Sequence, residues 1–283
     1  MLTGGPRTDL SDAGLIEAIE ADQLANRILD PEIAVEAHLD GDVVWCLAPM
    51  ADTFRNVVLG ARFSDADADR RIGEIADAYR RAGTGFVWWV APSDTPEDLG
   101  ARLAGAGLIL EGSAPAMAAD LRDVPLGEEP PKGLEVVPVT DAATLDEFLG
   151  VIAADWLEWT GGTYTDVQRR ALEAWRTQIP LRFAAEPVPL RWIGRIDGTV
   201  VATSRVNLGA GVAGLYAIST LAAHRGRGYG RALTIAALRA AASIGYRTAV
   251  LQSSDLGYGV YRKLGFRELL TYDVWVHPGP GGQ

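Results

Sequence analysis

One short segment limits the possible folds of this chain more than any other. Residues 224–231 read HRGRGYGR and lie between an apolar run typical of a β-strand, at 214–221, and a helix-forming run at 228–244. Glycines let the backbone turn tightly, and they leave N–H groups exposed at the positive end of the following helix. The segment therefore predicts a strand–loop–helix unit, and its N–H groups favour an anionic ligand such as a phosphate or pyrophosphate.

Two familiar phosphate-binding motifs do not fit this segment. A G-x-G-x-x-G fingerprint needs a third glycine where this sequence has Arg231, and a P-loop needs Lys followed by Ser or Thr after its last glycine. Arg225, Arg227 and Arg231 nevertheless add positive charge to the loop. From the residues alone, a tight strand-to-helix turn without a ligand stays open as the alternative.

The composition excludes several classes of protein. The chain has 283 residues, with 26 Lys+Arg against 37 Asp+Glu and a formal charge of −11, so a nucleic-acid partner is disfavoured. No run of about 18 uncharged apolar residues predicts a membrane span, and no membrane partner is expected. Three scattered histidines and a single cysteine, Cys46, indicate no metal site, and no G-x-S-x-G elbow occurs. The lone cysteine and an N-terminus without an apolar signal core predict a cytoplasmic protein.

A proline-rich break separates two stretches of ordinary globular composition. Residues 123–133 contain three prolines, two glycines and a pair of adjacent acids, which cannot hold a regular element. We therefore expect a domain at 1–122, a linker at 123–133 and a second domain at 134–283.

Hydrophobic periodicity and capping residues predict helices and strands on both sides of this break. Before it, helices are expected at 11–29, 65–81 and 96–105, and strands at 43–47, 56–63, 86–90 and 113–121. After it, helices are expected at 141–156, 166–178, 228–244 and 256–264, and strands at 134–139, 191–196, 200–207, 214–221, 248–252 and 271–276. The Asp197-Gly198 pair predicts a tight hairpin. The expected fold class is α/β with a mixed sheet.

Two motifs in this order resemble the GNAT superfamily of N-acetyltransferases. Arg225-x-x-Gly228-x-Gly230, which follows a strand and opens a helix, resembles the acetyl-coenzyme A signature of that family. Downstream, Tyr261, together with the Lys263-x-Gly265-Phe266 that follows, resembles its second landmark, Asn-x-x-Ala-x-x-Leu-Tyr-x-Lys-x-Gly-Phe. The resemblance covers about residues 134–276.

Two positions of the second landmark depart from the family pattern. Ser254 stands where Asn is usual and Gly257 where Ala is usual. The departure at Ser254 puts in doubt the side-chain contact that the family's Asn makes with the cofactor.

The resemblance implies an acetyl-coenzyme A site between two strands that splay apart. The backbone of the first strand would pair with the pantetheine amides, and the pyrophosphate would lie on the N–H groups of the glycine loop. The cofactor-binding residues expected from it are Ile218, Ser219, Thr220, Arg225, Gly226, Arg227, Gly228, Tyr229, Gly230, Arg231 and Ser254.

The resemblance also implies one catalytic residue, and the sequence suggests another. Tyr261 matches the family tyrosine that donates a proton to the leaving thiolate; the alternative is a tyrosine that packs in the core. Glu158 and Asp155 lie in the helix-to-loop region that the resemblance places beside the acceptor pocket, and burial between Trp156 and Trp159 would suit such a carboxylate, Glu158 first, to act as general base. Tryptophans at this spacing are also typical of a packing face. We expect His224 to be a loop residue.

The expected function is an acetyl-coenzyme A-dependent N-acetyltransferase. A small-molecule amine would attack the thioester directly in a ternary complex. Two alternatives stay open: a catalytically silent protein that senses acetyl-coenzyme A or another ligand, and an O-acetyltransferase with the same cofactor site. The sequence does not distinguish a monomer from a homodimer.

The first half is similar to a second, degenerate copy of the same fold. Its strand at 86–90, helix at 96–105 and strand at 113–121 repeat the order found at the end of the second half. No R-x-x-G-x-G precedes its helix at 65–81, so we expect this copy to bind no cofactor. An unrelated α/β domain is the alternative.

Overall fold

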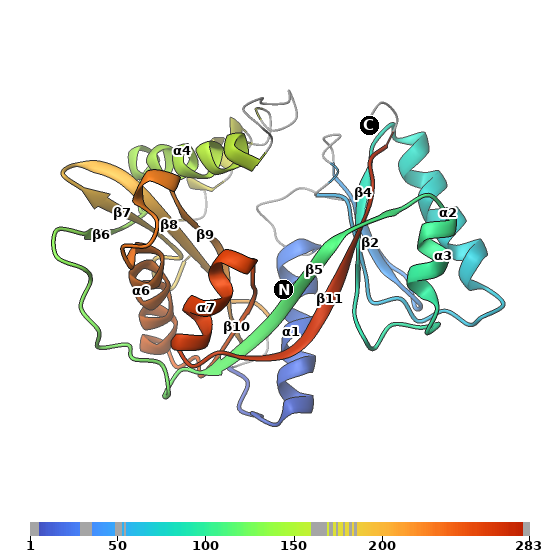
Figure 1. Cartoon of the computed structure of the whole chain (residues 1–283), viewed down its shortest axis with the longest axis horizontal. Helices are drawn as coiled ribbons and strands as arrows, with labels where there is room; N and C mark the ends of the chain where they lie inside the picture. The colour runs from blue at the N-terminus through green and yellow to red at the C-terminus, as the bar shows by residue number, and fades with distance from the viewer. Residues whose placement is uncertain are drawn as a thin grey trace. The chain divides into compact units, whose positions relative to one another are not determined.

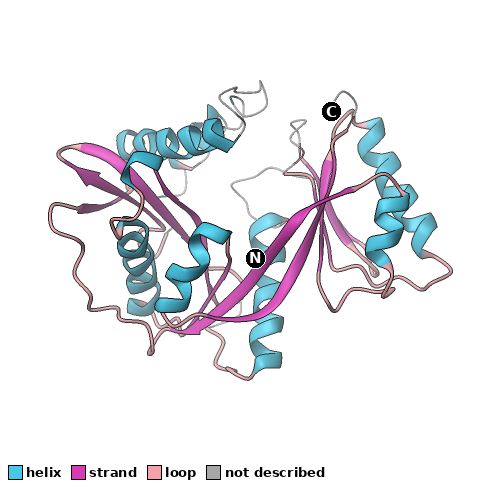
Figure 2. Cartoon of the chain, viewed as in Figure 1, coloured by secondary structure: helices cyan, strands magenta, loops and turns pink. Residues whose placement is uncertain are grey.

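The computed structural model describes residues 6–28, 36–48, 55–159 and 186–279, together with Thr53 and a few residues between 169 and 183. Helices and strands are mixed along these residues, with runs of consecutive strands at β1–β3, β5–β6 and β7–β9 (Figures 1 and 2). The helices are α1 (Asp12–Arg27), α2 (Ala68–Arg81), α3 (Leu99–Gly105), α4 (Ala142–Trp159), α6 (Tyr229–Ser243) and α7 (Asp255–Lys263). The strands are β1 (Glu36–Leu39), β2 (Val44–Leu47), β3 (Val57–Leu59), β4 (Phe86–Val90), β5 (Ile109–Asp120), β6 (Glu135–Pro138), β7 (Arg191–Ile196), β8 (Thr199–Asn207), β9 (Ala213–Thr220), β10 (Thr248–Gln252) and β11 (Arg267–His277).

The chain forms two compact units, and each of them is discontinuous in sequence. The first unit contains Met1–Asp22 and Met117–Arg267, and the second contains Gln23–Ala116 and Glu268–Gln283. The chain passes from one unit to the other within α1, β5 and β11.

The linear limits expected at 122 and 134 do not coincide with these units, because the two halves of the chain exchange their last strands. β5 ends the first half of the chain, yet its C-terminal end lies beside β10 of the first unit. β11 ends the second half, yet it pairs antiparallel with β4 of the second unit, with Trp275 opposite Trp88. Each unit is therefore completed by a strand from the other half of the sequence.

The first unit is built on a mixed sheet with the strand order β5-β10-β9-β8-β7-β6. β9 and β10 are parallel, whereas β8 pairs antiparallel with both β7 and β9. Asp197 and Gly198 connect β7 to β8 with φ angles of 49° and 79°, as the hairpin prediction requires. The alternation of side chains along the strands gives two cores, one with α6 and α7 and another with α4 (Figure 1).

The second unit has the strand order β1-β2-β3-β4-β11-β5. β3 and β4 are parallel, as β9 and β10 are in the first unit. Its core packs the buried faces of α2 and α3 around Trp88, with Ile72, Tyr79 and Leu103 fully or almost fully buried. The order β3-α2-β4-α3-β5 repeats the order β9-α6-β10-α7-β11, as expected for a second copy of one fold.

Most of the predicted elements are present, with shifted ends. β4 and β10 have the expected bounds, whereas β3 is shorter than the strand expected at 56–63 and α3 begins three residues after Pro96. The helix expected at 166–178 lies largely outside the described residues.

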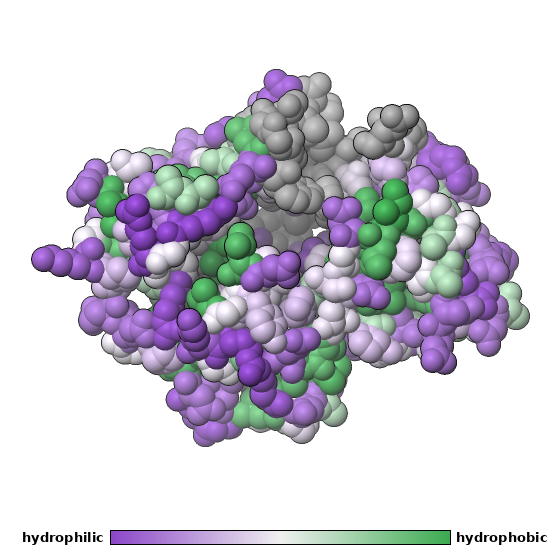
Figure 3. All heavy atoms as spheres, in the orientation of Figure 1, coloured by the Kyte–Doolittle hydropathy of each residue, from purple (hydrophilic) through white to green (hydrophobic). Residues whose placement is uncertain are grey.

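The surface of the described residues is mainly polar. On the face drawn in Figure 3, hydrophobic side chains occur in small groups between polar ones. The large hydrophobic residues that stay exposed are Leu39, Ile109, Leu110, Ile244 and Leu256. None of the described helices is long and apolar enough to cross a membrane.

Candidate active site

The glycine loop has the geometry of an anion cradle. After β9 and a short 3-10 turn at Ala222–His224, Gly226 and Gly228 adopt left-handed φ angles of 76° and 82°, which glycine tolerates without strain. Gly228 is the N-cap of α6. The backbone N–H groups of 226–228 have no hydrogen-bond partner among the described residues, and the first turn of α6 adds further free N–H groups. These donors fit an anionic group at the positive end of the helix dipole.

The loop lies against the end of β9, so the two groups of predicted cofactor residues meet. A Cβ added at Gly230 would lie 3.4 Å from Thr220 Oγ1 and 4.0 Å from Ile218 Cγ2. The Arg225 side chain donates a hydrogen bond to the Thr220 carbonyl at 3.0 Å. The strand segment and the loop therefore form one continuous surface.

Two of the three loop arginines are neutralised by carboxylates. The Arg225 guanidinium donates to both carboxylate oxygens of Glu158, at 2.7 and 2.9 Å. The Arg231 guanidinium does the same with Glu128, at 2.8 and 2.7 Å, and this hydrogen bonding lowers the pKa of Glu128. Among the residues that the structure describes, the Arg227 side chain bonds only to the Ala223 carbonyl, at 3.3 Å. An anion at the loop would therefore be bound mainly by backbone N–H groups and Arg227, because Arg225 and Arg231 are already paired with glutamates.

The environment of Glu158 differs from the expected one. Its side chain is 48% exposed, and the Arg225 guanidinium engages its carboxylate, so it is not a carboxylate buried between two tryptophans. The expectation was wrong on this point because the last turn of α4 presents Glu158 to the glycine loop. The pairing fixes the end of α4 to the loop, and a base role would require Glu158 to leave Arg225.

The parallel ladder between β9 and β10 is limited to the start of β9. Their parallel ladder pairs Ala213 with Ala249 and Gly214 with Val250, and β9 then runs on to Thr220. A β-bulge lies in the part of β9 beyond this ladder, where Ala217 has a φ of 50° and the β8–β9 register shifts. The bulge bends β9 at the start of the segment 218–220 that was predicted to bind the cofactor.

α7 carries the two remaining predicted residues. The Ser254 hydroxyl caps α7 by accepting from the Gly257 N–H at 3.3 Å, which gives this exposed residue a structural use of its own. Tyr261 is buried in the same core as Tyr229, and this burial raises its pKa to about 12. A Cβ at Gly257 would lie 2.7 Å from Tyr261 Cε2, so the Gly in place of the usual Ala makes room for the tyrosine ring.

The corresponding region of the second unit is closed. β3 and β4 pair in parallel at three register positions through Leu59 and Trp89, and the strands are tied again beyond their ends by Thr95, which donates to the Ala61 carbonyl at 3.0 Å. Residues 63–67, directly before α2, read FSDAD, so aspartates stand where the first unit has arginines and glycines. Neither an open gap between strands nor an anion cradle is present in this described part of the chain.

Sequence reasoning missed one polar pair of the first unit. Asp22, in α1, is fully buried and accepts a hydrogen bond from the hydroxyl of Tyr216 in β9. Gly214 gives the carboxylate its space. A glycine inside a strand indicates a close approach by another group, and this was the signal available in the sequence.

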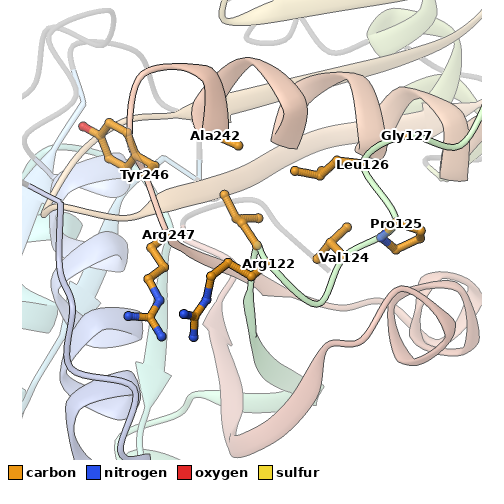
Figure 4. Close-up of a pocket in the computed structure, with 9 residues that line it drawn as sticks. Arg122, Val124, Pro125, Leu126, Gly127, Ala242, Tyr246 and Arg247 are labelled. Atoms are coloured by element: carbon orange, nitrogen blue, oxygen red, sulfur yellow. The ribbon is translucent and has the colours of Figure 1, made fainter.

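A pocket of about 700 Å³ lies at the other end of α6 (Figure 4). Its lining is Leu121, Arg122, Val124, Pro125, Leu126, Gly127, Ala242, Tyr246 and Arg247. Arg122 and Arg247 extend side by side, away from Val124 and Leu126 (Figure 4), and both are paired with Asp120, at 2.7 and 3.1 Å. α6 has 15 residues and is about 22 Å long, so this pocket is separate from the glycine loop.

Comparisons with known proteins found a matching family model and solved structures with a similar fold. The model of the acetyltransferase (GNAT) family matches residues 151–266. A GCN5-related N-acetyltransferase from Kribbella flavida has a TM-score of 0.68 and 22% identity, over 93% of this chain and 96% of that chain. A tandem GNAT protein from the clavulanic acid biosynthesis pathway has a TM-score of 0.58 and 16% identity, over 98% and 91% of the two chains. No curated protein matches the sequence.

The chain contains two copies of one α/β fold; the first unit has the glycine loop, and the described part of the second unit lacks it. The family-model match in the first unit supports an acyltransferase. Residues 151–266 form a domain that matches the model of the acetyltransferase (GNAT) family. The expected fold class, a GNAT-like mixed sheet in tandem with a degenerate copy, is confirmed. Members of this family generally use acetyl-coenzyme A.

Proposed function

We propose that the chain is an acetyl-coenzyme A-dependent N-acetyltransferase that acts on a small-molecule amine. The bound coenzyme supplies an activated acetyl thioester, and the amine attacks it directly in a ternary complex. Positioning of the two reactants contributes most of the rate in such a reaction, so few catalytic side chains are required.

The main support for this proposal is that two features of the first unit lie next to each other: the glycine loop and the end of the ladder between β9 and β10. The free N–H groups at 226–228 open α6, and β9 parts from β10 beyond Gly214 beside that loop. The loop would hold the pyrophosphate, and the backbone of 218–220 would hold the pantetheine amides. Ser254 is proposed as a neighbouring contact from the start of α7.

Tyr261 is proposed to assist the departure of the thiolate. A phenol with a pKa of about 12 is a much weaker acid than a coenzyme thiol with a pKa of about 8.5. Full proton transfer from Tyr261 is therefore unfavourable, and a hydrogen bond from its hydroxyl to the developing thiolate is the role that its burial supports.

Turnover tests the proposal. The whole chain is incubated with acetyl-coenzyme A and a panel of amines and alcohols, and thiol release is followed together with the mass of the acceptor. We expect acetylated amine and free thiol in equal amounts. Binding of acetyl-coenzyme A without thiol release from any acceptor supports the sensing protein instead, and acetylated alcohol supports O-acetyl transfer.

A further inference from the structure

Asp22 is the carboxylate that is hardest to explain by folding alone. It has 0% exposure, and burial of a charged group is costly unless other groups compensate it. The Tyr216 hydroxyl donates a hydrogen bond to Asp22 Oδ2. Both residues belong to the first unit.

The sequence of β9 makes room for this carboxylate. A Cβ at Gly214 would collide with Asp22, whose Cγ lies 2.7 Å from the Cβ position. Any other residue at 214 would therefore displace the carboxylate from the strand. The absence of a side chain at Gly214 lets Asp22 of α1 place its carboxylate against the backbone of β9.

Tyr216 and Asp22 lie near the point where the ladder between β9 and β10 ends. Gly214 opposite Val250 is the last register position of their ladder, and Tyr216 follows two residues later on the same face of β9. Tyr216 is partly exposed to solvent, whereas Asp22 is fully buried. Tyr216 precedes Thr220 by four residues, about 13 Å along the strand from the glycine loop. A pantetheine arm that follows β9 away from the loop would carry its thioester toward Tyr216.

We propose that Tyr216 and Asp22 form the proton-accepting pair for the acceptor amine, an inference that rests on the proposed function. Before attack, the alkylammonium gives one proton to Tyr216 Oη while the proton of the Tyr216 hydroxyl passes to Asp22 Oδ2. The neutral amine nitrogen then bonds to the acetyl carbon, the carbon–sulfur bond breaks, and the second nitrogen proton ends on the departing thiolate through solvent. After product release, Asp22 returns its proton to solvent through Tyr216. Tyr216 is then a catalytic residue, and Asp22 is a positioning residue that acts through it.

The pair also indicates the class of acceptor. An alkylamine with a pKa near that of lysine, about 10.4, is protonated at neutral pH and must lose a proton before it can attack. A weakly basic arylamine is already neutral and has less need of a buried base. The pair therefore fits a primary alkylamine substrate.

The test uses the whole chain with Tyr216→Phe and Asp22→Asn, each of which keeps the shape of the side chain. For an alkylamine we expect kcat to fall about 10²-fold or more in both variants. For an arylamine of the same panel we expect a clearly smaller loss. Acetyl-coenzyme A affinity by calorimetry should be unchanged, because neither residue belongs to the proposed cofactor surface.

Tyr246→Phe is the matched control. Tyr246 also lies in the first unit and donates to a carbonyl, that of Leu208 at 3.1 Å, so the variant loses a comparable hydrogen bond elsewhere. We expect it to keep the kcat of the wild type. If Asp22→Asn fails to fold, Tyr216→Phe alone decides.

The outcomes separate the two proposals. Equal losses for alkylamine and arylamine, or full activity of Tyr216→Phe, would overturn the inference while leaving the acetyltransferase intact. A wild-type chain that binds acetyl-coenzyme A but acetylates no amine overturns the proposed function and the inference with it.

Discussion

Replacement of Met117 by Ala should destabilise the first unit rather than the second. Met117 belongs to β5, which a linear division at residue 122 assigns to the N-terminal domain. In the structure its side chain is fully buried in the core of the first unit, in the same cluster as Leu233 and Leu238 of α6.

The expected cost follows from this burial. A buried methionine truncated to alanine leaves a cavity and loses about 2–5 kcal/mol of the free energy of unfolding. A whole domain has only about 5–15 kcal/mol, so the change is large. A loss of about 3 kcal/mol accelerates amide exchange through global opening of the unit about a hundredfold.

Hydrogen exchange read by mass spectrometry shows which unit has lost this stability. We expect faster exchange in peptides that cover α6 and β10, with little change in those that cover α2 and β4. Leu103→Ala is the matched control, because Leu103 is equally buried in the core of the second unit and should give the converse pattern. Loss of protection in α2 and β4 from Met117→Ala would refute the strand exchange.

Two further variants test the chemistry. Tyr261→Phe keeps the ring and should lower kcat at least about tenfold with little change in Tm, and wild-type turnover would make Tyr261 a packing residue. Burial raises the pKa of Tyr261 to about 12, above the value of about 10 in the unfolded chain. The contribution of the neutral phenol to the free energy of unfolding is therefore complete below about pH 10 and is lost as the pH rises toward 12. The free energy of unfolding should fall less steeply with pH in this range in Tyr261→Phe than in the wild type. Glu158→Gln removes the ion pair between Glu158 and Arg225. Because the Glu158 side chain is 48% exposed, this pair contributes little to stability, so Tm should fall only slightly and acetyl transfer should persist. A loss of about 10²-fold or more in kcat would restore Glu158 as the general base.

The features that sequence reasoning predicted well are local ones. The turn at Asp197-Gly198, the strand at 86–90 and the glycine loop before α6 each depend on neighbouring residues, whose φ preferences and hydrophobic pattern decide the structure. The repeated order of elements in the two halves was visible for the same reason.

The features that were missed depend on contacts between distant residues. The exchange of β5 and β11 leaves no local pattern, because a strand has the same hydrophobic alternation whichever sheet it joins. Asp22 is 192 positions from Gly214 in the sequence. The glycine inside the strand was the only sequence signal that another side chain packs against β9 at this position. Glu158 was misjudged because its neighbours in sequence suggested burial, whereas its partner, Arg225, comes from a separate loop.

A calorimetric titration of the whole chain with acetyl-coenzyme A tests the central claim most directly. The open strands and free N–H groups of the first unit, and the closed counterpart in the second, predict one site per chain. Gly230→Val should abolish that site with the fold intact, because the branched side chain would cover the loop beside Thr220. Two equivalent sites, no binding by the wild-type chain, or unchanged affinity in Gly230→Val would contradict the account.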